Sequence, residues 1–181
     1  PDMIVVLSDT HRSEGHGLSS VVLDAVREAT AVVHAGDFTT TAVVDAFEAL
    51  TDRLVAVHGN VDGGAVRERL PAERIEEIAG LRLAVVHGHE HTTVARSLLG
   101  READADLVIS GHSHRAAVAD ARGVTLLNPG SHADPRGGTA TFATLDLTGP
   151  AGEDGGIDGT IRTVDGTVLE RFSVPVGERR D

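Results

Sequence analysis

The chain has 181 residues, 40% of them hydrophobic, which is enough for one domain with a substantial core. It contains no cysteine, so disulfides and thiolate metal sites are excluded, and any metal ion must be held by His, Asp, Glu, Asn or backbone oxygens. No apolar run is long enough to span a bilayer, and no secretory signal pattern precedes the first apolar run. We therefore expect a cytoplasmic protein that makes no use of a membrane.

The charge balance is strongly acidic. Asp and Glu number 28 against 16 for Lys and Arg, the net charge is −12, and every one of the 16 is Arg. Because such a surface repels polyanions, binding of nucleic acid through a basic face is not expected. Aromatic residues make up 2%, all Phe, which leaves few platforms for base stacking. The lysine-free composition is typical of a halophile with a salt-rich cytoplasm or of a GC-rich genome, and the sequence does not separate the two.

The first part of the chain alternates between continuous apolar runs and amphipathic stretches. The apolar runs are typical of strands buried on both faces and lie at 3–7, 31–35 and 53–58. The amphipathic stretches predict helices at 20–27, 42–50 and 65–70. Ser19 or Ser20, and the threonines at 39–41, are N-cap candidates. This β-α-β-α-β-α order predicts a right-handed, largely parallel layer.

The remainder predicts mainly strands. The strand candidates are an edge strand with its turn at 74–81, and then 82–86, 106–110, 123–127, 139–147, 159–164 and 167–174. A helix is predicted at 92–99 with Thr92 or Thr93 as its cap, and Asp165-Gly166 indicates a hairpin turn. The Gly- and acid-rich stretch 149–158 is expected to be a mobile loop within a single domain of residues 1–181.

Side chains that can bind metal follow five of the apolar runs. They are Asp9 and His11, Asp37, Asn60, His87, and His112 with His114. Taken singly, Asp9 is compatible with a turn residue and His87 with a core histidine. The set is more specific, because ligands collect outside the carboxyl ends of strands. Seven ligands are too many for one tetrahedral zinc and suit two divalent ions that share a carboxylate, an arrangement used in phosphoryl transfer.

The motifs that carry these residues resemble those of a known family. They are Asp9-x-His11, Gly36-Asp37, Gly59-Asn60-x-Asp62, His87-Gly88-His89 and Gly111-His112-Ser113-His114. In order and spacing they resemble the five motifs of the calcineurin-like metallophosphoesterases. The small size and Asn128-Pro129-Gly130-Ser131 most resemble the YfcE-type phosphodiesterase subfamily. The resemblance covers about residues 3 to 145 and implies an α/β fold, a four-layer α-β-β-α sandwich with two facing mixed sheets.

The resemblance also implies how the ligands divide between two ions. Asp9, His11 and His114 would hold the first ion, and Asn60, His87 and His112 the second. Asp37 would bridge both ions, and a hydroxide between them would attack phosphorus in line. His112 and His114 would then bind different ions, with Ser113 as the spacer.

Four further residues receive roles from their positions. Asp37 and His89 are the predicted catalytic residues, His89 because it would face the substrate. Asp62 is expected to be structural. Val61 stands where many superfamily members have a histidine that stabilises the transition state or protonates the leaving group. The subfamily that the chain resembles also lacks this histidine. Esters with good leaving groups should suffer least from its absence.

The other histidines and two arginines receive ordinary interpretations. The histidines expected only to form hydrogen bonds within the fold are His16, His34, His58, His91 and His132. Arg12 and Arg115 lie beside predicted ligands, and for both a surface ion pair is favoured over a phosphate clamp.

The sequence thus predicts a dinuclear metal-dependent phosphoric ester hydrolase, acting on a phosphodiester of a small substrate in preference to a monoester. Mn²⁺ suits oxygen, imidazole and carboxamide ligands best, and Fe, Zn, Ni, Co or Mg could replace it. One alternative is a non-catalytic metal-binding scaffold that acts through protein partners, which the complete ligand set disfavours. Another is a nuclease, which the acidic charge disfavours. A homodimer and the identity of the substrate are left open.

Overall fold

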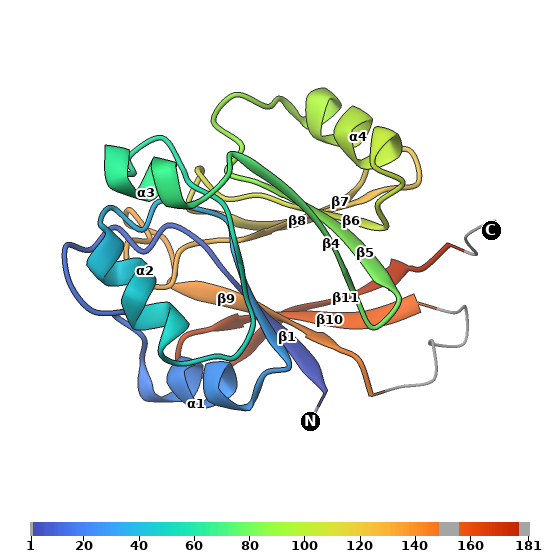
Figure 1. The fold of residues 1–181 in the computed structure, drawn as a ribbon. Helices are drawn as coiled ribbons and strands as arrows, with labels where there is room; N and C mark the ends of the chain where they lie inside the picture. Colours follow the sequence, from blue (N-terminus) through green and yellow to red (C-terminus); the bar gives the residue numbers. More distant parts are fainter. Residues whose placement is uncertain (1, 149–155, 178–181) are drawn as a thin grey trace.

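The computed structural model describes residues 2–148 and 156–177, which form two facing β-sheets with helices outside them (Figure 1). The strands are β1 (Met3–Leu7), β2 (Ala31–His34), β3 (Leu54–Ala56), β4 (Glu73–Ile78), β5 (Leu81–Val86), β6 (Leu107–Ile109), β7 (Ala116–Asp120), β8 (Thr125–Pro129), β9 (Thr141–Asp146), β10 (Gly156–Thr163) and β11 (Val168–Pro175). The helices are α1 (Ser20–Glu28), α2 (Thr41–Glu48), α3 (Gly64–Arg69) and α4 (Thr93–Glu102). None of these helices is long and apolar enough to cross a membrane.

The alternation of side chains along β1 explains the first two layers. Ile4 and Val6 are buried between the two sheets, whereas Val5 and Leu7 point outward and pack with α1 and α2. Because both faces of β1 are covered, its sequence is apolar throughout. The first sheet has the order β11-β10-β9-β1-β2-β3, and its β1, β2 and β3 are parallel as predicted.

The second sheet has the order β4-β5-β6-β8-β7 and is packed in the same way. Leu83 and Val85 of β5 face the first sheet, while Ala84 and Val86 point outward and pack with Ala103 at the end of α4. Figure 1 shows α4 on the outer side of this sheet and α1 and α2 on the outer side of the first. The predicted four-layer α-β-β-α sandwich with two mixed sheets is confirmed.

Three stretches differ from the sequence prediction. Strand β7 was not predicted, because it is an edge strand whose side chains are exposed or only partly buried, so its sequence lacks an apolar run. Strand β8 extends through Pro129, two residues beyond the predicted end at 127. Residues 156–158, predicted to be part of a mobile loop, open β10, where pairing with β9 and β11 overrides the local glycine content. Residues 149–155 of that loop lie outside the described residues.

Candidate metal centre

The predicted ligands lie on the loops that follow β1, β2, β3, β5 and β6. Five of them have a left-handed backbone, which is uncommon for residues other than glycine: Asp9 (φ 55°), His11 (φ 46°), Asp37 (φ 60°), His112 (φ 69°) and His114 (φ 60°). Such conformations cost about 1–3 kcal/mol each and persist only where the surroundings impose them. Here the loops after β1 and β2 are joined by amide hydrogen bonds from Asp9 to the Gly36 carbonyl and from His11 to the Asp37 carbonyl, both 3.0 Å.

Asp9, His11 and His114 form the first group of ligand atoms. Oδ1 of Asp9 lies 3.2 Å from Nε2 of His114 and 3.6 Å from Nε2 of His11. All three atoms are buried, yet none of them has a partner in hydrogen-bond geometry among the described residues. Buried polar atoms without partners are rare, and a cation among them would satisfy all three. The residues present therefore fit a divalent ion at this point, and this trio also meets the distance condition for a metal cluster.

Asn60, His87 and His112 form the second group. Oδ1 of Asn60 lies 3.1 Å from Nε2 of His87 and 3.0 Å from Nδ1 of His112. The other nitrogen of His87, Nδ1, lies 2.7 Å from the Ala35 carbonyl and so carries a hydrogen. This hydrogen bond fixes the tautomer that leaves Nε2 with a lone pair for a metal.

Asp37 lies between the two groups. Its Oδ2 is 3.2 Å from Nε2 of His11, in the first group, and 3.1 Å from Nε2 of His87, in the second. Its Oδ1 accepts a hydrogen bond of 2.9 Å from the amide of Val61. This is the placement that a carboxylate bridging two ions requires. Val61 thus contributes its backbone, while its side chain is 44% exposed.

The carboxylates and imidazoles shift each other's pKa values. Without a metal ion, the neighbouring carboxylates of Asp37 and Asp9 raise the pKa of His11 to about 9. Burial favours the neutral form of Asp37, but His11 and His87 outweigh it and hold the pKa of Asp37 well below its usual range. Burial likewise opposes the charge on His87, but Asp37 outweighs it and raises the pKa of His87. Protons thus balance the buried carboxylates, and a bound metal would displace them.

Asp62 holds two ligand loops together. Its Oδ2 accepts hydrogen bonds from the amides of Asp37 (3.0 Å) and Gly59 (2.7 Å), and its Oδ1 accepts one from the amide of Thr39 (2.6 Å). The side chain is 4% exposed. The sequence-based expectation of a structural Asp62 agrees with these contacts, which are to backbone amides and not to a ligand histidine.

The segment Asn128-Pro129-Gly130-Ser131 braces the loop after β6. The side-chain amide of Asn128 donates to the Gly111 carbonyl (2.8 Å) and to Oγ of Ser113 (3.0 Å). Ser131 donates from Oγ to the Asp9 carbonyl (2.7 Å). The carbonyl of Asp134, a residue that the sequence did not single out, contacts Nδ1 of His114 and so directs Nε2 towards Asp9. The only advance signal for this brace was the family resemblance of residues 128–131.

Two of the histidines given an ordinary interpretation lie directly beneath the centre. His34 and His132 are fully or nearly buried, and Nε2 of each lies 2.8 Å from Oγ1 of Thr10, between the ligands Asp9 and His11. Burial lowers the pKa of His34, and it lowers the pKa of His132 to about 4, so both rings are neutral. Their hydrogen bonds to Thr10 are as expected, but the buried Nδ1 of His132 has no hydrogen-bond partner among the described residues.

The remaining candidates lie at the rim. His89 is partly buried, with its ring centroid 5.5 Å from that of His87 and 6.1 Å from that of His112, and burial lowers its pKa. Nδ1 of His16 accepts from the Leu18 amide. His91 differs from expectation, because its buried Nδ1 has no hydrogen-bond partner among the described residues. Arg12 donates to the Glu14 carbonyl and forms no ion pair with any described carboxylate.

Comparisons with known proteins agree with this geometry. Residues 3–149 match the calcineurin-like phosphoesterase superfamily domain. The chain is 35% identical over 139 residues to a probable metallophosphoesterase of Methanocaldococcus jannaschii. This alignment covers 74% of this chain and 70% of that protein. It is 26% identical over 154 residues to a phosphodiesterase of the same organism, which covers 79% of this chain and 92% of that protein.

Solved structures show the same fold. Vps29 of Chaetomium thermophilum superimposes with a TM-score of 0.78 at 17% identity, covering 97% of this chain and 98% of that one. A predicted phosphoesterase of Streptococcus pneumoniae superimposes with a TM-score of 0.68 at 24% identity, covering 95% and 97%. These two likenesses concern the fold alone. The match over residues 3–149 and the relative at 35% identity show that this chain belongs to the calcineurin-like phosphoesterase superfamily.

Proposed function

We propose that the chain is a dinuclear metal-dependent phosphoesterase that hydrolyses a phosphodiester of a small substrate. The observation that carries this proposal is the convergence of Asp9 Oδ1, His11 Nε2 and His114 Nε2, three buried atoms without hydrogen-bond partners, beside the bridging position of Asp37. The second ion would lie among Asn60, His87 and His112. Mn²⁺ is the ion that this donor set suits best.

When bound, two divalent ions would neutralise charge on the phosphoryl oxygens and lower the pKa of a water molecule. The chain's own residues hold the ligand atoms in place through the backbone contacts of Asp62, Asn128 and Ser131. His89 would face the substrate from the rim. In the reaction a bond forms between the water oxygen and phosphorus, the bond from phosphorus to the ester oxygen breaks, and the leaving alcohol takes up a proton.

A diester is favoured over a monoester because a relative that is 26% identical over 154 residues is named a phosphodiesterase. A small substrate is favoured over a polynucleotide because the chain carries a net charge of −12. The protein would act in the cytoplasm as one domain.

The test begins with protein stripped by a chelator and reloaded with Mn²⁺. The wild type should bind two ions, counted by elemental analysis, and should hydrolyse bis-p-nitrophenyl phosphate. Asp37→Ala should lose both properties, because one carboxylate serves both ions. Asp45→Ala is the matched control, since this carboxylate on α2 is 64% exposed and pairs with Arg69 of α3, 2.6 Å away. Full activity of Asp37→Ala would contradict the proposal.

A second result distinguishes the proposed phosphoesterase from the non-catalytic metal-binding scaffold. Several solved neighbours are Vps29 proteins, whose likeness to this chain extends to the fold. If the chain binds two ions but releases no product from any diester or monoester with any of the divalent ions, a metal-binding scaffold is the better description.

A further inference from the structure

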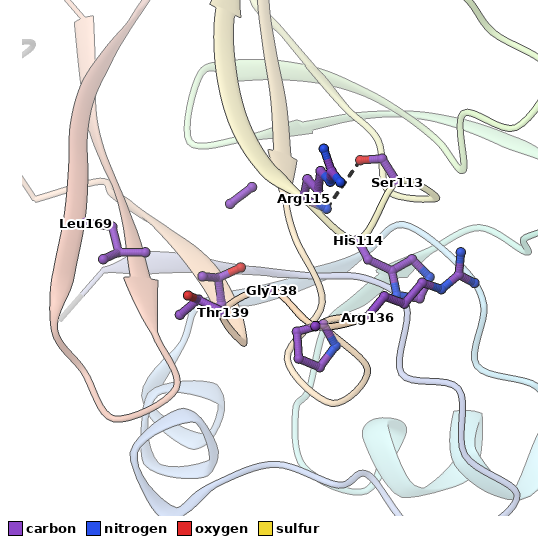
Figure 2. Close-up of a pocket in the computed structure, with 11 residues that line it drawn as sticks. Ser113, His114, Arg115, Arg136, Gly138, Thr139 and Leu169 are labelled. Carbon is purple, nitrogen blue, oxygen red and sulfur yellow. Dashed lines mark hydrogen bonds between the residues drawn. The ribbon is translucent and has the colours of Figure 1, made fainter.

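A pocket adjoins the metal centre on the side of His114. It has a volume of about 510 Å³ and lies between the loop after β6, the segment 135–139 and Leu169 of β11 (Figure 2). His114, whose side chain is 1% exposed, lines this pocket and also belongs to the first ligand group. A molecule in the pocket would therefore be next to the position of the first ion. The volume is in the range of small-molecule sites, about 300–1,000 Å³.

Two arginines line this pocket. Arg115 and Arg136 line it with His114, and none of the described Asp or Glu residues does, although the chain as a whole has a net charge of −12. The nearby carboxylate of Asp134 lies beside Arg136 and His114 and offsets part of this positive charge. Ser113, Thr139 and the apolar Leu169 are among the other residues that line it.

The two guanidinium groups are weakly paired. The ion pair expected for Arg115 is not found with any described carboxylate, and its amide, not its side chain, contacts Ser113. Arg136 has one ion pair, with Nε 3.8 Å from Oδ2 of Asp134. By contrast, Arg69 on α3 lies 2.6 Å and 2.5 Å from two carboxylates. Arg115 and Arg136 thus keep most of their hydrogen-bond donors for another acceptor.

Arg136 lies in a tight turn at the pocket. It has a left-handed φ of 46° and is followed by Gly137 at 81°, in a turn closed by the Gly138 amide donating to the Pro135 carbonyl. Arg136 and His114 both approach Oδ2 of Asp134, which is 3.8 Å from Nε of Arg136 and 3.6 Å from Nδ1 of His114.

Building on the phosphoesterase function proposed above, we propose that Arg115 and Arg136 form a subsite for a second anionic group, phosphate or carboxylate, on the substrate. The substrate class is then a small phosphodiester whose alcohol portion carries another anion a few atoms from the reacting phosphorus. The planar guanidinium groups bind such an anion through paired hydrogen bonds, and Leu169 covers the carbon portion.

Three p-nitrophenyl diesters with one leaving group test this specificity. Their second alcohols are ethanol, glycolate and ethylene glycol monophosphate, so they carry no further anion, a carboxylate and a phosphate respectively. In the Mn²⁺-loaded wild type, kcat/KM should be higher for the two anionic diesters, mainly through a lower KM. Arg115→Gln and Arg136→Gln should each lower the ratio of anionic to neutral kcat/KM about tenfold, as expected for a lost charged hydrogen bond. The larger loss identifies carboxylate or phosphate as the preferred group.

Arg171→Gln is the matched control, because it removes the same charge from a different pocket on the first sheet. It should leave the ratio unchanged. If Arg115→Gln and Arg136→Gln also leave the ratio unchanged, or lower kcat/KM equally for all three diesters, the subsite is refuted.

A binding measurement separates this inference from the proposed activity. Inorganic pyrophosphate is titrated calorimetrically into protein held in a chelator, so that no ion contributes. The wild type should bind it at least fivefold more tightly than the double variant Arg115→Gln/Arg136→Gln, with Arg171→Gln behaving as the wild type. Arginine-dependent binding in a protein that hydrolyses no ester would overturn the phosphoesterase proposal and keep the anion subsite. Equal binding by all variants would overturn the subsite.

Discussion

Asp62→Ala is the change that most directly tests how the ligand loops are held. The carboxylate of Asp62 accepts three hydrogen bonds from the amides of Asp37, Thr39 and Gly59, at 3.0, 2.6 and 2.7 Å. Alanine removes all three acceptors and leaves buried amide donors on the loops after β2 and β3. These loops carry Asp37, which we propose to bridge the two ions, and Asn60, a proposed ligand.

The size of the effect follows from these contacts. A hydrogen bond to a charged group contributes about 1.5–3 kcal/mol. If all three hydrogen bonds were lost without replacement, the free energy of unfolding would fall by more than about 4 kcal/mol. Water can reach part of the gap, because Val61 beside Asp62 is 44% exposed. We expect the free energy of unfolding to fall by about 3–4 kcal/mol, which lowers Tm by roughly 10 °C in a chain of this length.

The assay is thermal and urea unfolding in a chelator, followed by calorimetric titration with Mn²⁺. Asp62→Ala should also bind Mn²⁺ at least tenfold more weakly, because both loops lose their common anchor. Asp62→Asn should fall between alanine and the wild type, since one amide oxygen can still accept. Asp45→Ala should change stability by less than about 1 kcal/mol, as for an exposed ion pair. If the free energy of unfolding of Asp62→Ala fell by less than about 1 kcal/mol, Asp62 would not be the anchor of these loops.

Three further results are expected. Gly59→Ala should abolish tight Mn²⁺ binding in calorimetry, because its Cβ would lie 2.1 Å from Oδ1 of Asp37, whereas Gly64→Ala meets no atom within 4 Å and should bind normally. In chelator, His132 should make the free energy of unfolding of the wild type fall by up to roughly 3 kcal/mol as the pH is lowered from 6.5 to about 4. The reason is that the imidazole of the unfolded chain takes up a proton near pH 6.5, whereas in the folded chain it does so only near its lowered pKa of about 4. Unfolding curves of His132→Gln should show a correspondingly shallower decline, and an identical decline would contradict this. His89→Gln should lower kcat/KM for bis-p-nitrophenyl phosphate while two Mn²⁺ ions still bind, and an unchanged kcat/KM would argue against His89 facing the substrate.

The ligand loops could be predicted from sequence because their signals are local. Met3–Leu7 is an apolar run followed at once by Asp9 and His11, and Leu107–Ile109 leads through a glycine to His112 and His114. A strand that is buried on both faces has consecutive apolar residues, which can be recognised in the sequence. A ligand at the end of such a strand follows it directly in the chain and needs no long-range information. The four-layer arrangement came from the family resemblance and not from these local patterns.

What could not be predicted depends on contacts between distant segments. The Asp134 carbonyl reaches His114 across 20 residues. The pocket beside His114 is lined by Arg115, Arg136 and Leu169. These residues adjoin β7, β9 and β11, which belong to two different sheets, so they come together only in the folded chain. The sequence alone therefore favoured a surface ion pair for Arg115. Strand β7 was missed for the same reason, because its partner β8 and not its own composition defines it.

The contacts of the ligand residues explain why so strained a set of loops can exist before a metal ion binds. Each of four ligands uses one polar atom for the scaffold and keeps the other for the centre. Oδ2 of Asp9 accepts from the His112 amide and Oδ1 of Asp37 from the Val61 amide, while Nδ1 of His87 and of His114 contact backbone carbonyls. The atoms that remain, Oδ1 of Asp9, Oδ2 of Asp37 and the two Nε2 atoms, are those that converge. Three of these four residues, Asp9, Asp37 and His114, have a left-handed backbone, and their scaffold hydrogen bonds leave the converging atoms available. We therefore expect the centre to be organised before a metal ion binds.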